Sequence, residues 1–262
     1  KTFLEEERMM QLCALISAKR FSGKMPEPAI LKYTDELGKV HGPLWTGKQI
    51  FSLLLPDTLN YTKKTNIYKD PPASLSGINR KLFSWFNDSV ITIEKGQILS
   101  GILDKKSLGV SGGSLIHCIF NDYGQERVRH FTDQIQWIAN HWLLHNGFSI
   151  GISDCMLHTE SSKSVIANFI AESVDKAESI AAHSLKTDAR KAEEKINTSL
   201  NNATTNVGKY VQTTISNRNS LIAMVNAGSK GNHLNVSQIM AIVGQQNLAG
   251  KRIPMNNLGR AL

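Results

Sequence analysis

The sequence predicts an α+β fold, with a small β-containing domain over residues 1–157 and a mostly helical domain over residues 158–262 that carries a protruding antiparallel helical hairpin. Two runs of β-branched residues flank a glycine-containing turn near residue 95, which is typical of a β-hairpin. A long amphipathic stretch ends at Gly147. After about residue 158 the composition shifts to small and polar residues with almost no aromatics, which favours exposed helices with little core of their own.

The first part of the chain is expected to alternate between helix and extended backbone. Residues 3–18 combine strong helix formers with apolar residues at helical spacing, which predicts a helix. Several prolines follow, and because each disfavours helical backbone in the residue before it, residues 24–43 are expected to form an extended strap. Thr46 is a candidate N-cap for a short helix over residues 47–55, which Pro56 would end.

The middle of the chain predicts a long surface excursion, a hairpin and a helix. Residues 57–87 are mixed in character and show no clear period. The hairpin is expected from Val90 to Leu103 around the turn at residues 94–97. Apolar residues at steps of three or four over residues 124–145 predict an amphipathic helix, with Gly147 as its C-cap.

The last hundred residues predict helices that pack through a narrow apolar stripe. Helix is expected to about residue 201, to resume over residues 206–226, and to return briefly over residues 236–243. The stripe consists of Ile166, Phe169, Ile170, Val174, Ala177 and Ala181. A stripe this narrow suits two helices that lie against each other and project from the rest of the protein.

Composition favours a soluble, intracellular, globular protein. The chain has 262 residues, of which 41% are hydrophobic and 20% charged, and it contains neither a secretory signal pattern nor a long apolar run. Cys13, Cys118 and Cys155 are too scattered for a disulfide framework or a zinc site, so buried thiols in a reducing compartment are expected. A net charge of +8 favours polyanionic partners such as nucleic acid or nucleotides, although solvated lysines would give the same balance.

Two motifs resemble catalytic or metal sites but lack the residues that the chemistry needs. Residues 42–49 have the glycine and lysine spacing of a phosphate-binding P-loop, yet Gln49 stands where a hydroxyl would reach magnesium, so a structural turn is favoured. His141 and His145 lie one helical turn apart without a third ligand, and a packed pair is favoured over a metal site. We therefore expect no catalytic residue and no metal ligand in this chain.

Two glycine-rich turns carry lysines that could contact phosphate. Lys105 and Lys106 precede the flexible stretch 107–113, and Lys230 lies between Gly228 and Gly231. Glycine allows backbone amides to approach an anion closely, which supports a binding role. Ordinary surface turns are the alternative interpretation.

These stretches, taken together and in order, resemble the largest subunit of the eukaryotic-type, multisubunit DNA-dependent RNA polymerases. The resemblance covers nearly the whole chain, and Trp-Leu-Leu-His-Asn-Gly-Phe-Ser-Ile-Gly at residues 142–151 is its most diagnostic motif. The other matching segments are residues 26–30, 43–50, 95–98, 104–109, 112–117, 224–231, 235–238 and 243–253. The excursion at residues 57–93, the helices rich in alanine, lysine and threonine, and residues 254–257 depart from the family's pattern.

The resemblance implies a pore domain over residues 1–157 and a funnel domain over residues 158–262, leading to the bridge-helix region. In the family these domains form the secondary channel through which nucleoside triphosphates enter and the 3′ end of backtracked RNA leaves. The family's magnesium-binding aspartate loop does not occur in these 262 residues. Magnesium would therefore be held elsewhere in the whole enzyme, and the chain alone is expected to be inactive.

The resemblance also assigns candidate site residues. Lys105, Lys106 and Lys230 match family lysines near the route by which nucleotides enter. A second group matches the floor of the active centre, including the region that amatoxins contact in the family. This group consists of Gln238, Gln245, Gln246, Lys251 and Arg252.

The implied partners are the other polymerase subunits, nucleoside triphosphates and the RNA 3′ end, the DNA template in the whole enzyme, and a transcript cleavage factor at the funnel, without a membrane. The departures from the pattern suggest a divergent and possibly virus-encoded enzyme, which would act in the nucleus if cellular and in the host cytoplasm if viral. The alternative from another functional class is a free-standing basic helical module that binds acidic partners or nucleic acid.

Overall fold

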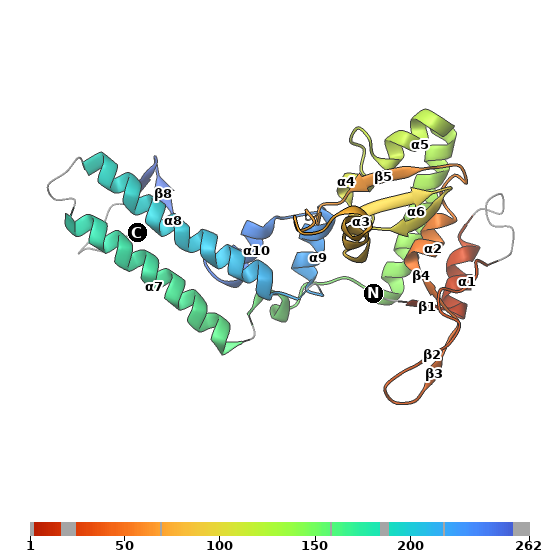
Figure 1. Cartoon of the computed structure of the whole chain (residues 1–262), viewed down its shortest axis with the longest axis horizontal. Helices are drawn as coiled ribbons and strands as arrows, with labels where there is room; N and C mark the ends of the chain where they lie inside the picture. The colour runs from red at the N-terminus through yellow and green to blue at the C-terminus, as the bar shows by residue number, and fades with distance from the viewer. Residues whose placement is uncertain are drawn as a thin grey trace. The chain divides into compact units, whose positions relative to one another are not determined.

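The computed structural model describes residues 3–16, 25–68, 70–157, 159–183, 189–216 and 218–253. The chain divides into two compact units (Figure 1). Residues 1–148 together with 226–228 form the first unit, and residues 149–225 together with 229–262 form the second. The α+β class predicted from the sequence is confirmed, since small antiparallel sheets occur in the first part of the chain and long helices in the second.

The first unit contains most of the strands. Its elements are β1 (Phe3–Glu5), α1 (Glu6–Ala14), β2 (Tyr33–Thr34), β3 (Val40–His41), β4 (Leu44–Thr46), α2 (Gly47–Ser52), β5 (Tyr61–Lys64), α3 (Gly77–Phe86), β6 (Val90–Glu94), β7 (Gln97–Ser100), α4 (Lys105–Leu108), α5 (Leu115–Tyr123) and α6 (Gln125–Asn146). The predicted hairpin is confirmed as β6 and β7, and β5 adds a third antiparallel strand (Figure 1). The core of this unit fully buries Met9, Leu54 and Phe131.

The helix predicted over residues 3–18 is shorter than expected. β1 pairs antiparallel with β4, with Leu4 opposite Trp45, and α1 begins only at Glu6. Pairing with a distant strand overrides helix propensity here because it buries both Leu4 and Trp45. The predicted end of this helix, beyond residue 16, lies outside the described residues.

The predicted capping positions are confirmed at two helices. Thr46 caps α2: its side chain accepts a hydrogen bond from the backbone N–H of Gln49, whose side chain in turn accepts from the backbone N–H of Thr46. α6 ends before Gly147, whose φ of 61° is a conformation that glycine adopts at little cost. The surface excursion is more ordered than expected, because it contains β5 and α3.

The second unit is mainly helical. It contains a short 3₁₀ helix (Ile152–Cys155), α7 (Glu160–His183), α8 (Ala189–Thr214), most of α9 (Ser220–Ala227), α10 (His233–Met240), β8 (Asn247–Leu248) and β9 (Lys251–Arg252). α7 and α8 form the predicted antiparallel pair (Figure 1). Tyr210 of α8 donates to Ser162 at 3.1 Å, and Ser199 donates to the Ser173 carbonyl at 3.1 Å. The start of α7 therefore lies against the end of α8, and residues later in α7 lie against residues earlier in α8.

The helix break predicted between residues 201 and 206 is wrong. α8 runs through it without interruption because Ala203, Val207 and Val211 lie on one face and are buried. None of the helices in the described part of the chain is long and apolar enough to cross a membrane.

Candidate functional site

Lys105 and Lys106 project from a one-turn helix, α4, whose backbone is fixed by a buried capping box. The Asp104 carboxylate accepts a hydrogen bond from the backbone N–H of Ser107 at 2.8 Å and from the Ser107 hydroxyl at 2.7 Å. The backbone N–H of Asp104 donates back to the Ser107 hydroxyl oxygen at 2.9 Å. Both residues are buried, whereas the two lysines are exposed. The turn is therefore rigid at its base and charged at its surface.

Long-range contacts attach this turn to the rest of the first unit. The second oxygen of Asp104 accepts a hydrogen bond from the backbone N–H of Asn66, which follows β5. The Tyr61 hydroxyl lies 3.3 Å from the Ser107 carbonyl oxygen and 3.1 Å from that of Gly113. Burial raises the pKa of Tyr61, so its hydroxyl stays protonated and remains a donor. The α4 turn is thus held by β5 on one side and by the loop before α5 on the other.

Lys230 lies in the turn between α9 and α10, in the second unit. Gly228 and Gly231 have φ values of 70° and 71°, a region that favours glycine. The backbone N–H of Ser229 donates to the Met224 carbonyl at 3.0 Å, and Asn232 caps α10. Lys230 is exposed between these fixed points.

Residues 226–228 belong to the first unit, and Gly228 contacts the α4 region there. A Cβ atom at Gly228 would lie 2.1 Å from the Asn66 amide nitrogen and 3.4 Å from the Lys105 Cβ. The φ of 70° favours glycine here, whereas the Asn66 amide is the end of a flexible side chain that could move aside. The chain reaches Lys230 two residues later.

The three predicted lysines share an uncompensated charge. Among the described residues, no side chain or backbone group forms a hydrogen bond or ion pair with the ammonium groups of Lys105, Lys106 or Lys230. Their positive charges are therefore available to a mobile anion in solution. Lys105 and Lys106 lie together on α4, while Lys230 belongs to the other unit.

The three predicted glutamines bind backbone groups of one loop in the second unit. Gln238 of α10 donates from its side chain to the Val243 carbonyl at 3.2 Å. Gln245 donates to the Gln246 carbonyl at 2.7 Å, and Gln246 donates to the Gly244 carbonyl at 3.4 Å. The structure therefore brings these glutamines together around residues 243–246, where they hold the loop that follows α10.

Lys251 and Arg252 form β9, but only Lys251 is fully exposed. Arg252 makes a two-pronged ion pair with Glu193 of α8, with nitrogen to oxygen distances of 2.9 and 3.0 Å. Hydrogen bonding from Arg252 holds the pKa of Glu193 below its usual value and raises that of Arg252. This pair attaches the β8–β9 hairpin to α8, a role that the sequence did not indicate.

The two motifs that were doubted as catalytic sites have structural explanations. Lys48 of the P-loop-like stretch forms a 2.6 Å ion pair with Asp88, which also accepts a hydrogen bond from the backbone N–H of Gly101 at 3.1 Å. The rings of His141 and His145 meet edge to face, with centroids 4.9 Å apart. The described residues contain no group of three or more His, Cys, Asp or Glu side chains that could hold a metal ion.

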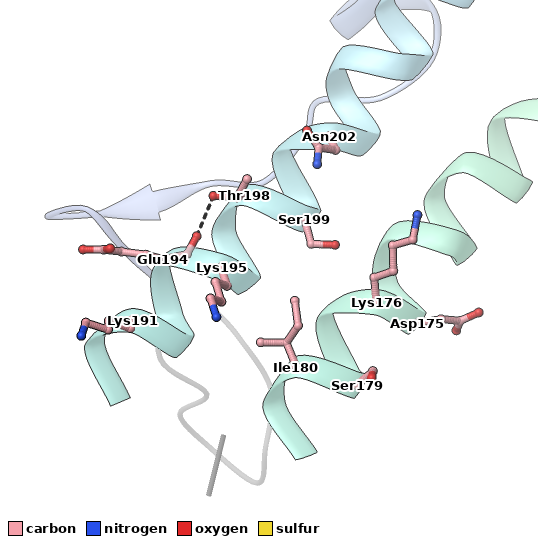
Figure 2. Close-up of a pocket in the computed structure, with 10 residues that line it drawn as sticks. All are labelled: Asp175, Lys176, Ser179, Ile180, Lys191, Glu194, Lys195, Thr198, Ser199 and Asn202. Atoms are coloured by element: carbon pink, nitrogen blue, oxygen red, sulfur yellow. Dashed lines mark hydrogen bonds between the residues drawn. The ribbon is translucent and has the colours of Figure 1, made fainter. Parts of the chain in front are cut away.

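A groove of about 850 Å³ lies between α7 and α8. Ile180 of α7 and Lys195 of α8 point into the space between the helices (Figure 2). The other lining residues are Asp175, Lys176, Ser179, Lys191, Glu194, Thr198, Ser199 and Asn202. Charges of both signs surround a small apolar patch, a composition that suits a polar protein surface more than a small apolar ligand.

Comparison with known proteins decides the family. Residues 1–155 match the family model of RNA polymerase Rpb1, domain 3, and residues 170–262 match that of RNA polymerase Rpb1, domain 4. The chain belongs to the RNA polymerase Rpb1 family. Two DNA-directed RNA polymerase II subunits of Trypanosoma brucei brucei, RPB1-B and RPB1-A, are each 36% identical to it over 248 residues. These alignments cover 91% of this chain and 13% of each relative.

The Rpb1 matches divide the candidate residues between the two domains. The α4 lysines fall within the domain 3 match, and Lys230, the glutamines, Lys251 and Arg252 fall within the domain 4 match. The chain spans about an eighth of the length of these relatives. It therefore corresponds to Rpb1 domains 3 and 4, a segment of the polymerase largest subunit.

Proposed function

We propose that this chain forms the wall of the secondary channel of a DNA-directed RNA polymerase. Nucleoside triphosphates would pass along it to the active centre, and the 3′ end of backtracked RNA would leave by the same route. The observation that carries the proposal is the pair of exposed, uncompensated lysines on α4, held by a buried capping box and contacted by Gly228. Family membership supports assigning this turn to the polymerase.

The three lysines would attract and orient triphosphates before the chemical step. Each is an unpaired charge on a backbone anchored at both ends, so it can bind phosphate without breaking an internal contact. Magnesium in the complete enzyme would supply the nucleotidyl-transfer chemistry, with ligands that lie outside this chain. The chain by itself is accordingly expected to make no RNA from a primed template with magnesium.

The loop after α10 would contribute to the floor of the active centre. Gln238, Gln245 and Gln246 make hydrogen bonds to backbone carbonyls within that loop. Arg252 would support it indirectly through Glu193, while Lys251 is the residue of β9 with its charge exposed.

The partners follow from the same proposal. Other polymerase subunits would surround the chain, and the complete enzyme would bind the DNA template. A transcript cleavage factor would bind at the α7–α8 groove. The compartment would be that of the complete enzyme, which is the nucleus for a cellular polymerase and the cytoplasm for a virus that transcribes there. Membership of the Rpb1 family favours this function over a free-standing basic interaction module.

Photo-crosslinking in the complete polymerase tests the proposal. A stalled elongation complex would be irradiated with 4-thio-UTP, and the labelled peptides of this chain would be mapped. We expect labels within residues 104–110 and 227–233, competed by unlabelled UTP. Labelling of the rest of the subunit without either segment would contradict the proposal.

A further inference from the structure

The segment from residue 58 to residue 87 concentrates positive charge and aromatic rings. It contains five basic residues and one acid, a net charge of +4 out of +8 for the whole chain. It also contains five aromatic residues. Basic residues interleaved with aromatics are typical of surfaces that bind single-stranded nucleic acid, because phosphates take the charge and bases stack on the rings.

The described part of this segment forms a pocket of about 440 Å³ beside β5. Its lining residues are Thr62, Lys63, Lys64, Tyr68, Pro71, Gly77, Ser84 and Val90. This volume lies within the range of small-ligand pockets and is large enough for one nucleotide unit. Gly77 has a φ of 53° and no atom within 4 Å of the position of a Cβ, so the pocket is open beside it.

Lys64 and Tyr68 are already arranged as a cation and ring pair. The Lys64 ammonium lies 4.1 Å from the centre of the Tyr68 ring. Lys64 is exposed, Tyr68 is half-buried, and no carboxylate among the described residues pairs with Lys64. The pair therefore places an uncompensated charge directly beside an aromatic ring.

The neighbouring contacts hold this pair in position. Lys63 donates to the Gly113 carbonyl at 2.8 Å, which anchors β5 to the loop before α5. Asn66, midway between Lys64 and Tyr68, donates its backbone N–H to Asp104 at the start of α4. The pocket is thus tied, within the first unit, to the turn that carries Lys105 and Lys106.

We propose that the pocket beside β5 binds single-stranded nucleic acid, with Lys64 contacting a backbone phosphate and Tyr68 stacking on the adjacent base. An acidic peptide would satisfy Lys64 but would leave the aromatic ring without a matching planar partner, so nucleic acid is favoured. The proposal does not rest on the secondary-channel function, because it concerns β5 and is measured without nucleotide addition.

Fluorescence anisotropy of the 262-residue chain with labelled ten-nucleotide RNA and DNA tests the proposal, with polyglutamate and ATP as competitors. The Tyr68→Leu variant should bind the oligonucleotides about five- to a hundredfold more weakly, since the stacking of one base on the ring is lost. Tyr68→Phe should stay within about twofold because the ring remains. Lys64→Gln should weaken binding several-fold and reduce its salt dependence. Lys209→Gln, at an exposed lysine of α8 that pairs with no carboxylate among the described residues, is the matched control and should have no effect.

Each outcome decides between nucleic acid and the other ligands. Binding of either oligonucleotide supports the proposal, and a difference between the RNA and DNA affinities identifies which of the two is preferred. Polyglutamate that competes as well as RNA of equal charge would overturn it, as would equal affinities of the wild-type and Tyr68→Leu chains. Crosslinking of 4-thiouridine RNA in the complete polymerase provides a second measurement, which should label the peptide that contains Tyr68. Tryptophan fluorescence and circular dichroism of each variant confirm that it is folded.

Discussion

The two units are stabilised in different ways. The first has a large core in which Met9, Leu12 and Phe131 are fully buried, and its α4 turn is attached to that core by buried polar groups. The second has a small core around Val207 and Val211, and its long helices meet largely through small residues. The large core of the first unit holds an irregular charged turn in place. The narrow apolar stripe of the second unit holds together only a pair of long helices, with a groove between them.

Truncation of the two cores should give the largest difference. Phe131→Ala should destabilise the first unit by about 3–5 kcal/mol, while Val207→Ala in the second should cost about 2 kcal/mol because it removes less apolar volume. All four tryptophans, Trp45, Trp85, Trp137 and Trp142, lie in the first unit. Tryptophan fluorescence should therefore follow denaturant unfolding of the first unit, and circular dichroism should follow both units. Equal shifts of both signals in both variants would contradict the division into two units.

A side chain at Gly101 should cost about 2–3 kcal/mol. Gly101 has a φ of 88°, and a Cβ there would lie 2.3 Å from the Ile91 Cα, a backbone atom that cannot move independently of the sheet. Gly250→Ala is the control in the second unit, because its φ of 77° is similar but no atom lies within 4 Å. Thermal unfolding should show a clearly larger loss for Gly101→Ala. Similar losses would mean that backbone conformation, and not the packing of the first unit, determines the cost.

Loss of the Asp88 charge should cost about 2 kcal/mol, because Asp88 accepts hydrogen bonds from Lys48 and from the Gly101 backbone in a largely buried position. Asp88→Asn keeps the shape and removes the charge. Asp133→Asn, at an exposed carboxylate 3.5 Å from Arg129, is the matched control and should change little. If both variants unfold at the same denaturant concentration, the buried polar contacts do not stabilise the first unit as argued.

The smallest effect is expected for Glu193→Gln in the second unit, at most about 1 kcal/mol, since the Glu193–Arg252 pair is partly exposed to solvent. Arg252 lowers the pKa of Glu193 in the folded chain from its usual 4.5. The stabilisation is therefore fully present above pH 4.5 and is lost as the pH falls through the folded pKa. The wild type should exceed the variant in stability at pH 7, and the difference should shrink as the pH falls below 4.5. A difference that persists unchanged at pH 3 would show that the carboxylate charge is not the cause.

Features encoded by neighbouring residues were predictable from the sequence. The Thr46 cap, the β6–β7 hairpin and the Gly147 end of α6 each depend on residues within a few positions of one another. The pairing of β1 with β4 was not predictable, because residues 3–5 favour helix locally and only a distant strand makes them extended. The continuity of α8 was missed for a similar reason, since burial of Val207 outweighs the weak helix propensity around it.

The candidate lysines could be identified from the sequence, but the long-range contacts that hold their turns in place could not. Glycine-rich turns and the family resemblance pointed to Lys105, Lys106 and Lys230, and all three are exposed. The contact of Asp104 with Asn66, and of Gly228 with the α4 turn, joins residues far apart in the chain and leaves no periodic signal. The Asp104 to Ser107 spacing was a local sign of a capping box that could have revealed the rigid turn.

The most direct test of the central claim is the nucleotide requirement of the complete polymerase when Lys105, Lys106 and Lys230 are replaced by alanine. Each partly solvated contact should contribute about 0.5–1 kcal/mol, so the half-saturating nucleotide concentration for elongation should rise from several-fold to about a hundredfold at low salt and less at high salt. The control replaces three exposed lysines of α7 and α8, Lys163, Lys176 and Lys209, by alanine, and it should leave the half-saturating nucleotide concentration unchanged. An unchanged half-saturating concentration in the first variant at both salt concentrations would contradict the claim that these lysines guide nucleotides to the active centre.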